Sequence, residues 1–259
     1  MTTRHVYDRQ AVSYDTTRGA SPSVLAPLRE ALEDAPGREL VDIGGGTGNY
    51  ARALREDGWD PLVVDLNAAM LARAEAKGLR TLRADAAALP LPDESADATM
   101  LVSMLHHVPD WRAALREARR ILRPSGRLAL MGWSREHMER VTWVRDYFPS
   151  MNDWLALDHP SLVELEGELP GARLLRVEFN DLADASLSAL QRRPELVLEP
   201  RWHRQTSYFE KLEQRFPAEL QTGMDQLRRD LEAGENPDAR VADARAEFGD
   251  AIVLAWVKP

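Results

Sequence analysis

Short apolar runs alternate with amphipathic stretches through the first half of the chain. Apolar runs that fit buried strands cover residues 39–43, 61–65, 79–83, 96–104 and 127–133. Between them, apolar residues recur at helical spacing over residues 50–56, 68–76 and 111–122. Strands that alternate with helices of this length predict a parallel sheet with helices on both faces.

Local signals mark the ends of several of these elements. Ser21-Pro22 fits a helix N-cap followed by proline at the first helical position, and Pro36-Gly37 stops the helix that begins there. Asp110 is a favourable N-cap for the helix after the fourth strand, and Gly78 fits the C-terminal end of the helix over 68–76. Pro124-Ser125-Gly126 predicts a turn before the fifth strand.

The pattern changes after Ser134. Residues 135–171 combine tryptophan, charge and proline with helical patches, and residues 172–179 form a predicted strand. Residues 182–247 are mostly helical in pattern, with breaks at four prolines: Pro194, Pro200, Pro217 and Pro237. An apolar run over 251–257 predicts a final strand. We expect this strand to complete the same sheet and the helical excursions to form a cap beside it.

Composition excludes several classes of protein. The chain has 33 Lys and Arg against 42 Asp and Glu, a formal net charge of −9, which disfavours nucleic acid or an anionic membrane as main partner. The absence of cysteine excludes disulfides, zinc–thiolate sites and cysteine nucleophiles. The polar first twenty residues and the absence of a long apolar run predict a cytoplasmic protein, which we expect to be a monomer or homodimer.

A glycine-rich loop follows the first predicted strand. In Val41-Asp42-Ile43-Gly44-Gly45-Gly46-Thr47-Gly48, glycines allow a tight turn and the close approach of a ligand to the backbone. A nicotinamide-dependent oxidoreductase favours the pattern G-x-G-x-x-G, whose last position here is Asn49. Asp42 either caps backbone N–H groups of the loop or orients a ligand indirectly.

The next three strands end in residues that suit a nucleoside ligand. Asp65 ends the second strand, where a carboxylate accepts hydrogen bonds from two ribose hydroxyls. Asp85-Ala86 follows the third strand, within reach of an adenine amino group, and Ser103 to His107 follows the fourth at the carboxyl edge of the sheet. The alternative for each acid is a solvated residue at a strand end.

Five segments in this order resemble the class I S-adenosylmethionine-dependent methyltransferases: VDIGGGTG, VVDLNAAML, ADAAALPLPDESAD, VSMLHHVPDW and ALREARRILRPSGRLAL. The resemblance is to the small-molecule branch similar to ubiquinone/menaquinone biosynthesis methyltransferases, and it covers residues 14–134. It implies a Rossmann-like, doubly wound sheet of seven strands, mostly parallel with an antiparallel last strand. It also implies S-adenosylmethionine as cofactor and S-adenosylhomocysteine as product. The long insertion before the last strand departs from the family pattern.

The resemblance assigns roles to individual residues. Gly44 and Gly46 would lie under the methionine portion and ribose, Asp65 would hold the ribose hydroxyls, and Asp85 would bond the adenine amino group. Arg18, in a Y-D-x-x-R element, could pair with the cofactor carboxylate or lie on an exposed helix face. The full cofactor-binding set that we expect is Tyr14, Arg18, Asp42, Gly44, Gly45, Gly46, Asp65, Leu66, Asn67, Met70, Asp85, Ala86 and Ser103.

His107, and after it His106, is the candidate catalytic base. Methyl transfer to an O, N or C atom of a small molecule is an SN2 displacement, and imidazole can take a proton from the acceptor near neutral pH. Alternatively, either ring packs on the cofactor or bonds a backbone carbonyl. A metal site formed with Asp110 lacks a third ligand, so no metal is expected.

The chain therefore divides into functional parts. We expect residues 1–36 to cover the cofactor site, 37–134 to form the cofactor-binding core, 135–171 and 181–249 to form the cap, and 172–180 and 250–259 to close the sheet. Cap tryptophans line an aromatic pocket or form plain core: Trp133, Trp143, Trp154 and Trp202. A basic run either faces solvent or binds a carboxylate-bearing acceptor: Arg192, Arg193, Arg201 and Arg204.

The predicted function is methyl transfer to a quinone, natural product or other secondary metabolite. The alternatives are a carboxyl methyltransferase of a small organic acid and a non-catalytic cofactor-binding regulator. A nicotinamide-dependent oxidoreductase is the alternative that Asn49 argues against.

Overall fold

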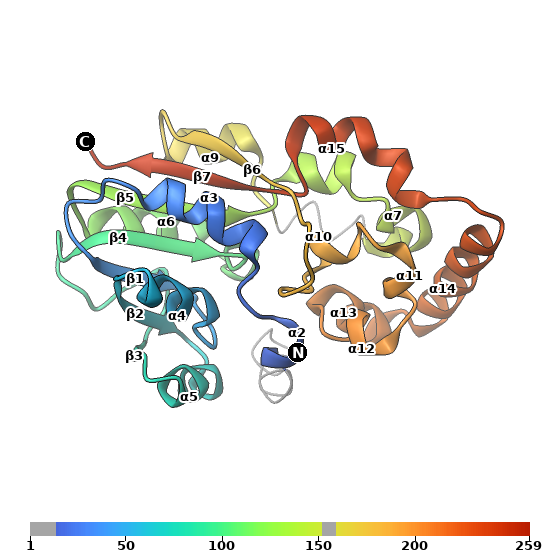
Figure 1. Ribbon diagram of the computed structural model, residues 1–259, viewed down its shortest axis with the longest axis horizontal. Helices are drawn as coiled ribbons and strands as arrows, with labels where there is room; N and C mark the ends of the chain where they lie inside the picture. The colour runs from blue at the N-terminus through green and yellow to red at the C-terminus, as the bar shows by residue number, and fades with distance from the viewer. Residues whose placement is uncertain (1–13, 152–158) are drawn as a thin grey trace.

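One mixed sheet runs through the chain (Figure 1). In the computed structural model, which describes residues 14–151 and 159–259, seven strands lie in the order β3-β2-β1-β4-β5-β7-β6. Their bounds are β1 Glu39–Ile43, β2 Asp60–Asp65, β3 Arg80–Arg83, β4 Ala96–Val102, β5 Leu122–Gly132, β6 Arg173–Val177 and β7 Ala251–Val257. Strands β1 to β5 pair in parallel, whereas β7 is antiparallel to β5 and β6. The predicted fold class is confirmed.

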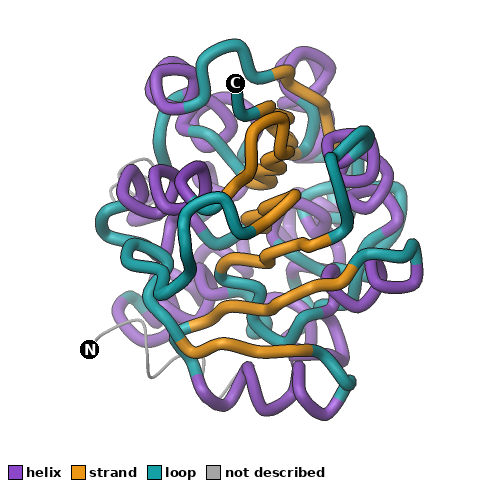
Figure 2. Tube along the Cα trace, turned by 90° about the vertical axis from the view of Figure 1, so that its left-hand side faces the viewer, coloured by secondary structure: helices purple, strands orange, loops and turns teal. Residues whose placement is uncertain are grey.

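Helices cover both faces of this sheet (Figure 2). One face packs against α3 (Pro22–Leu32), α4 (Asn49–Glu56) and α5 (Ala68–Ala76), and the other packs against α6 (Trp111–Arg120) and α9 (Leu162–Glu168). Strand β1 is buried on both faces. Leu40 packs in the apolar core formed with α3, α4 and α5, and Val41 packs in the core formed with α6 and α9. A continuous apolar run is therefore needed in this strand.

Side-chain caps begin several helices as the sequence predicts. The Ser21 hydroxyl accepts a hydrogen bond from the Ser23 N–H at the start of α3, and the Asp110 carboxylate accepts one from the Ala113 N–H at the start of α6. Gly78 follows α5 with a φ of 75°, a conformation that suits glycine.

Three strand boundaries differ from the sequence prediction by two residues or more. Strand β6 ends at Val177 rather than at residue 179. Strand β4 ends at Val102 rather than residue 104, because Ser103 takes a φ of 51° and leaves the extended conformation. Strand β5 begins at Leu122, so the predicted helix over 111–122 ends earlier, at Arg120. The expected turn over 124–126 is an irregularity within β5, where the register shifts between Ala96 and Ala98 of β4.

The remaining helices gather beyond the carboxyl end of β4 (Figure 1). We call them the helical cap: η2 His137–Val141, α7 Val144–Tyr147, η3 Pro149–Met151, α10 Leu187–Leu190, α11 Pro194–Val197, α12 Pro200–His203, α13 Ser207–Arg215, α14 Pro217–Glu232, η4 Pro237–Val241 and α15 Ala242–Phe248. The four prolines that break the sequence pattern each start a helix. An apolar core of its own, including Trp143, Phe148 and Phe209, holds the cap together.

The segment over 135–171 is divided between the two parts of the molecule. Residues Met138 to Met151 join the cap core, whereas Leu165 and Leu169 of the α9 region join the core beneath the sheet. Helix α9 therefore belongs to the sheet side, because its apolar face is buried against α6. Among the described residues, no helix combines the length and the apolar character needed to cross a membrane.

Packing inside the cap predicts the effect of one substitution. A Cβ atom on Gly223 of α14 would collide with the Phe148 ring and the Tyr147 carbonyl oxygen. Although alanine is intrinsically favoured over glycine in helices, we expect Gly223→Ala to lower the free energy of unfolding by about 1–3 kcal/mol through overpacking. Urea denaturation measures this.

Gly167→Ala in α9 is the matched control, because a Cβ atom there meets nothing within 4 Å. We expect that substitution to leave stability unchanged or raise it by less than about 1 kcal/mol. Equal stability of the Gly223→Ala and wild-type proteins would contradict the close packing of α14 on Phe148.

Candidate functional site

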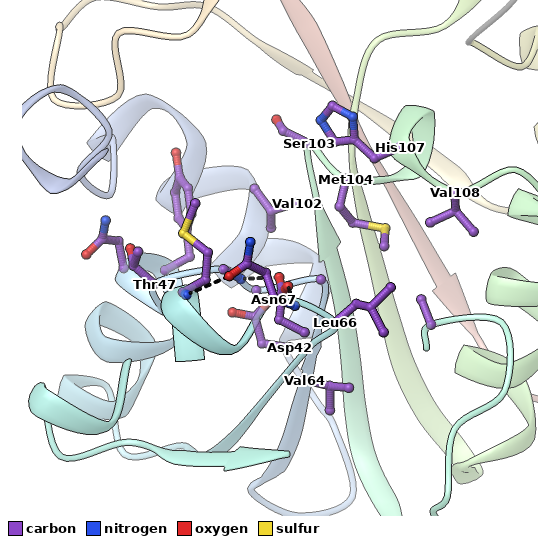
Figure 3. Close-up of a pocket in the computed structure, with 18 of the residues that line it drawn as sticks. Asp42, Thr47, Val64, Leu66, Asn67, Val102, Ser103, Met104, His107 and Val108 are labelled. Carbon is purple, nitrogen blue, oxygen red and sulfur yellow. Dashed lines mark hydrogen bonds between the residues drawn. The ribbon is translucent and has the colours of Figure 1, made fainter. Parts of the chain in front are cut away.

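A cavity of about 490 Å³ opens at the carboxyl edge of the sheet (Figure 3). Its wall is built by the loops that follow β1, β2, β3 and β4, with additions from the N-terminal segment and from the segment after β6. The residues predicted from sequence that line it are Arg18, Asp42, Gly44, Gly45, Gly46, Asp65, Leu66, Asn67, Met70, Asp85, Ala86, Ser103 and His107. Residues from six separate segments thus meet at the edge that the sequence indicated.

Among the predicted site residues whose side chains the structure describes, one is not part of this wall. His106 lines a separate small cavity together with Trp133 and His159. Tyr14 is the first residue of α2 (Tyr14–Thr17), and its side chain lies outside the described part of the chain.

Other lining residues were missed by sequence reasoning: Thr47, Asn49, Tyr50, Val64, Ala84, Val102, Met104, Val108, Pro109 and Asp184. Most are direct neighbours of the recognised motifs and could have been found by extending each motif by one or two residues. Asp184 carries no such signal, because only the tertiary structure brings it to the cavity.

The glycine loop is shaped by backbone hydrogen bonds to the end of β2. The N–H groups of Gly44 and Gly45 donate to the Val64 carbonyl oxygen at 2.7 and 3.1 Å. Gly44 and Gly46 have φ values of 70° and 57°, which favour glycine. A Cβ atom on Gly44 would lie 2.6 Å from Met104, whereas one on Gly46 would meet nothing within 4 Å. Gly46 therefore leaves open space where a ligand can approach the backbone.

Two carboxyl groups lie behind this loop. Asp65 accepts hydrogen bonds from the Gly46 N–H at 2.9 Å and from the Asn67 N–H at 2.8 Å. Burial raises its pKa, and these backbone donors oppose the rise. Asp42 is 1% exposed, and burial, followed by the charge of Asp65, raises its pKa to about 8. Among the described residues, Asp42 Oδ1 is buried without a hydrogen-bond partner. At neutral pH Asp42 is therefore largely protonated.

The adenine-side candidates are set by local turns. Asn67 is the N-cap of α5, and its side-chain oxygen accepts from the Ala69 and Met70 N–H groups. Asp85 accepts a hydrogen bond from the Ala87 N–H at 2.9 Å, which fixes its carboxylate at the rim of the cavity. Leu66 remains 50% exposed between them, so an apolar surface faces the opening.

The end of β4 carries the histidines. Ser103 holds its left-handed conformation with a hydrogen bond from its N–H to the Met131 carbonyl oxygen at 2.9 Å. The short helix η1 (Leu105–His107) follows and places His107 in the wall, beside Ser103 and Met104 (Figure 3). Burial, followed by the charge of Lys211, lowers the pKa of His107 to about 3. The imidazole is therefore neutral at physiological pH.

His106 connects this wall to the cap. Its ring centroid lies 3.8 Å from that of His107 and 4.9 Å from that of His159, and the ring of His159 is stacked on it. A hydrogen bond of 3.2 Å joins His159 Nε2 to the Tyr208 hydroxyl of α13. Burial, followed by the charge of His107, lowers the pKa of His106 well below its usual value. A series of ring contacts thus continues from the cavity wall into the cap.

The cap tryptophans and arginines have different positions. Trp133 follows β5 and lines the small cavity, whereas Trp143 is fully buried in the cap core. Trp154 lies outside the described residues. None of the four arginines of the basic run lines the main cavity. Arg201 and Arg204 instead pair with Glu199 and Glu213 on the surface.

Within residues 14–151 and 159–259, no group of three or more His, Asp or Glu side chains is placed to hold a metal ion. The charged or ionisable side chains at the cavity include four carboxyl groups, of Asp42, Asp65, Asp85 and Asp184, and the guanidinium of Arg18.

Comparison with known proteins places this site in a family. Residues 41–130 match the family described as a methyltransferase domain. Over 180 residues the chain is 34% identical to a ubiquinone/menaquinone biosynthesis C-methyltransferase, UbiE, of Caulobacter sp. (strain K31), which covers 60% of this chain and 71% of the relative. The UbiE of Caulobacter vibrioides is 33% identical over 66% of this chain and 79% of its own.

A solved structure from Anabaena variabilis, assigned to the methyltransferases of an antibiotic biosynthesis pathway, shares the fold. It superimposes with a TM-score of 0.73 over 92% of this chain and 98% of its own, at 23% identity. The likeness in fold thus includes the cap, whereas the likeness in sequence to the UbiE proteins covers about two thirds of the chain. The chain belongs to the class I S-adenosylmethionine-dependent methyltransferases, and S-adenosylmethionine is its cofactor.

Proposed function

We propose that this protein methylates a ring carbon of a small, quinol-like aromatic molecule. The similarity to C-methyltransferases of ubiquinone and menaquinone biosynthesis supports the type of acceptor. The observation that carries the proposal is the neutral His107 in the cavity wall, continued by the stacked rings of His106 and His159. A neutral imidazole in the wall, with further aromatic rings packed behind it, suits a flat aromatic molecule better than a charged one.

The residues at the cavity fit the cofactor. The open side of Gly46 admits a ligand against the backbone, and the unpaired Oδ1 of the buried Asp42 is a polar atom that a bound group can satisfy. We propose that Asp65 binds the ribose hydroxyls, with Leu66, Asn67 and Met70 beside the adenine. Asp85 and the Ala86 backbone would bind the adenine amino edge, and Ser103 would approach the methionine portion through its backbone.

The cofactor supplies a methyl group that its positively charged sulfur makes electrophilic. The chain has to orient the acceptor, keep water out and handle one proton. His107 is placed to accept a hydrogen bond from an acceptor hydroxyl, which increases electron density on the ring. Because its imidazole is neutral, it adds no positive charge beside the sulfur.

The proposed division of the chain follows from this assignment. Residues 37–134 hold the cofactor, the N-terminal segment within 1–36 covers it, and the insertions over 135–171 and 181–249 enclose the acceptor, except α9, which packs beneath the sheet. The closing strands over 172–180 and 250–259 fix the cap to the core, since β6 leads directly into it.

Product analysis tests the proposed reaction. We expect the purified protein to transfer a labelled methyl group from S-adenosylmethionine to a ring carbon of a reduced, demethylated benzoquinone or naphthoquinone with a short apolar tail. Mass spectrometry and NMR locate the methyl group. Methyl ethers from the same panel, or methyl esters from small organic acids, would contradict transfer to carbon.

Asp65 should control cofactor affinity. We expect Asp65→Ala to weaken S-adenosylhomocysteine binding by more than about tenfold, because hydrogen bonds from the ligand and from the Gly46 N–H are both lost. Isothermal titration calorimetry measures the dissociation constant. Asp60→Ala is the control at the opposite end of β2, where the side chain is 57% exposed, and it should bind normally. Wild-type affinity in Asp65→Ala would contradict the assignment.

His107 should control turnover. We expect His107→Gln to lower kcat by about tenfold or more with little change in cofactor affinity, because the glutamine amide does not reproduce the position of the imidazole nitrogen that accepts the hydrogen bond from the acceptor hydroxyl. Steady-state kinetics with the best acceptor from the panel measures this. His106→Gln is the matched control, because its ring lies outside the main cavity and should affect kcat less.

The pH profile gives a second readout for His107. Because the pKa of His107 is lowered to about 3, its neutral form is present throughout the assay range. Wild-type kcat should therefore not fall on the acid side of about pH 6.5, the usual pKa of histidine. An acid limb near that pH that disappears in His107→Gln would show that the imidazole titrates normally. A loss in His106→Gln as large as in His107→Gln would move the role to His106.

A further inference from the structure

One wall of the cofactor cavity comes from outside the sheet and its loops. Arg18 lies between α2 and α3, Tyr50 in the first turn of α4, and Asp184 in the segment that enters the cap after β6. The Arg18 Nε–H donates to Asp184 Oδ1 at 2.6 Å, and the Tyr50 hydroxyl donates to Asp184 Oδ2 at 2.8 Å. Asp184 is 3% exposed, so a buried carboxylate is oriented through both oxygens at the edge of the cavity.

Backbone hydrogen bonds fix Arg18 against the cap segment. The Gly19 N–H donates to the Ala183 carbonyl oxygen at 2.6 Å, and the Ala185 N–H donates to the Thr17 carbonyl oxygen at 2.7 Å. A Cβ atom on Gly19 would lie 2.9 Å from the Ala183 oxygen, so a residue without a side chain is needed for this approach. The ion pair is therefore supported by main chain on both sides.

The same N-terminal segment is attached to the glycine loop through Asp15. Asp15 Oδ1 accepts hydrogen bonds from the Thr47 hydroxyl at 2.6 Å, the Asn49 side-chain amide at 2.9 Å and the Lys77 ammonium at 2.9 Å. The Asn49 amide also donates to the Arg18 carbonyl oxygen at 2.6 Å. The position of Arg18 is thus set from the glycine loop and from the cap together.

The family resemblance already implies that the Arg18 guanidinium pairs with the carboxylate of the cofactor. We propose that Asp184, which is held beside Arg18, faces the ammonium of the same amino-acid group. A buried cation–anion pair has no net charge and is complementary to a zwitterion, which also has none.

The position of Arg18 and Asp184 agrees with the orientation of the cofactor in the proposed function, on which this inference rests. Asp85 follows β3, at one edge of the sheet, and Asp65 follows the neighbouring β2. The segment of Asp184 follows β6, at the opposite edge. A ligand with its nucleoside at Asp85 and Asp65 extends its amino-acid end across the glycine loop toward Asp184. The cap would then contribute a direct contact to the cofactor.

Two ligands that differ only at the amino-acid end test this. S-adenosylhomocysteine carries the group, whereas 5′-methylthioadenosine has the same nucleoside and sulfur without it. For Asp184→Asn, calorimetry should show the dissociation constant of S-adenosylhomocysteine raised about tenfold or more, and that of 5′-methylthioadenosine changed less than about twofold. Arg18→Gln should show the same selectivity, which provides a second variant if Asp184→Asn does not fold.

Asp181→Asn is the matched control. Its carboxylate accepts hydrogen bonds from Ser21 and Ser23 and anchors the same N-terminal segment, but it does not line the cavity. It should leave both dissociation constants within about twofold of wild type.

Four results would overturn the inference. Equal weakening of both ligands in Asp184→Asn and Arg18→Gln would show a structural role only, and unchanged or tighter binding of S-adenosylhomocysteine would show that Asp184 does not face the ammonium. The same selective loss in Asp181→Asn would show that anchoring of the segment is sufficient. Failure of the wild type to bind S-adenosylhomocysteine would instead overturn the cofactor placement itself, and the inference with it.

Discussion

The attachment of the glycine loop to the end of β2 is the constraint on which the site depends. Three consecutive N–H groups, of Gly44, Gly45 and Gly46, donate to the Val64 carbonyl and the Asp65 carboxylate. Gly44 and Gly46 have left-handed backbone conformations, and a Cβ atom on Gly45 would collide with the Asp42 carboxyl group, so each position favours glycine. They also orient Asp65, so the loop and its acid form one unit. Neighbouring loops are then placed around this unit by the parallel order of the strands.

The sheet and the core of the site could be predicted because their signals are local. Apolar runs define buried strands, and a glycine cluster or an acid at the end of each run defines the carboxyl edge. Ser103 shows the limit of that approach, since its left-handed conformation ends β4 before the apolar pattern does. The turn expected at 124–126 is instead an irregularity within β5. Two backbone hydrogen bonds with Lys258, which is distant in the sequence, hold it in the sheet: the Ser125 N–H donates to the Lys258 carbonyl oxygen, and the Lys258 N–H donates to the Gly126 carbonyl oxygen.

The sequence could not have predicted that Asp184 lines the cavity or that His159 stacks on His106. Each lies in a region whose local pattern indicates only helix or loop, and each reaches its position through packing against residues more than fifty positions away. Both residues are positioned by the cap, which has an apolar core of its own. Their positions therefore depend on how the cap packs against the sheet. Sequence motifs describe the cofactor side of a methyltransferase well because that side is built from short segments. The acceptor side is built from contacts between distant ones.

The strand order has a consequence for how the chain is made. Strand β7 lies between β5 and β6 but is synthesised after both, with the whole cap intervening between β6 and β7. On the ribosome, β6 therefore has no neighbour in the sheet until β7 emerges, and β5 presents an open edge throughout synthesis of the cap. Pairing across so many intervening residues is slow. The nascent protein must keep these two edges from pairing with other chains until β7 is available.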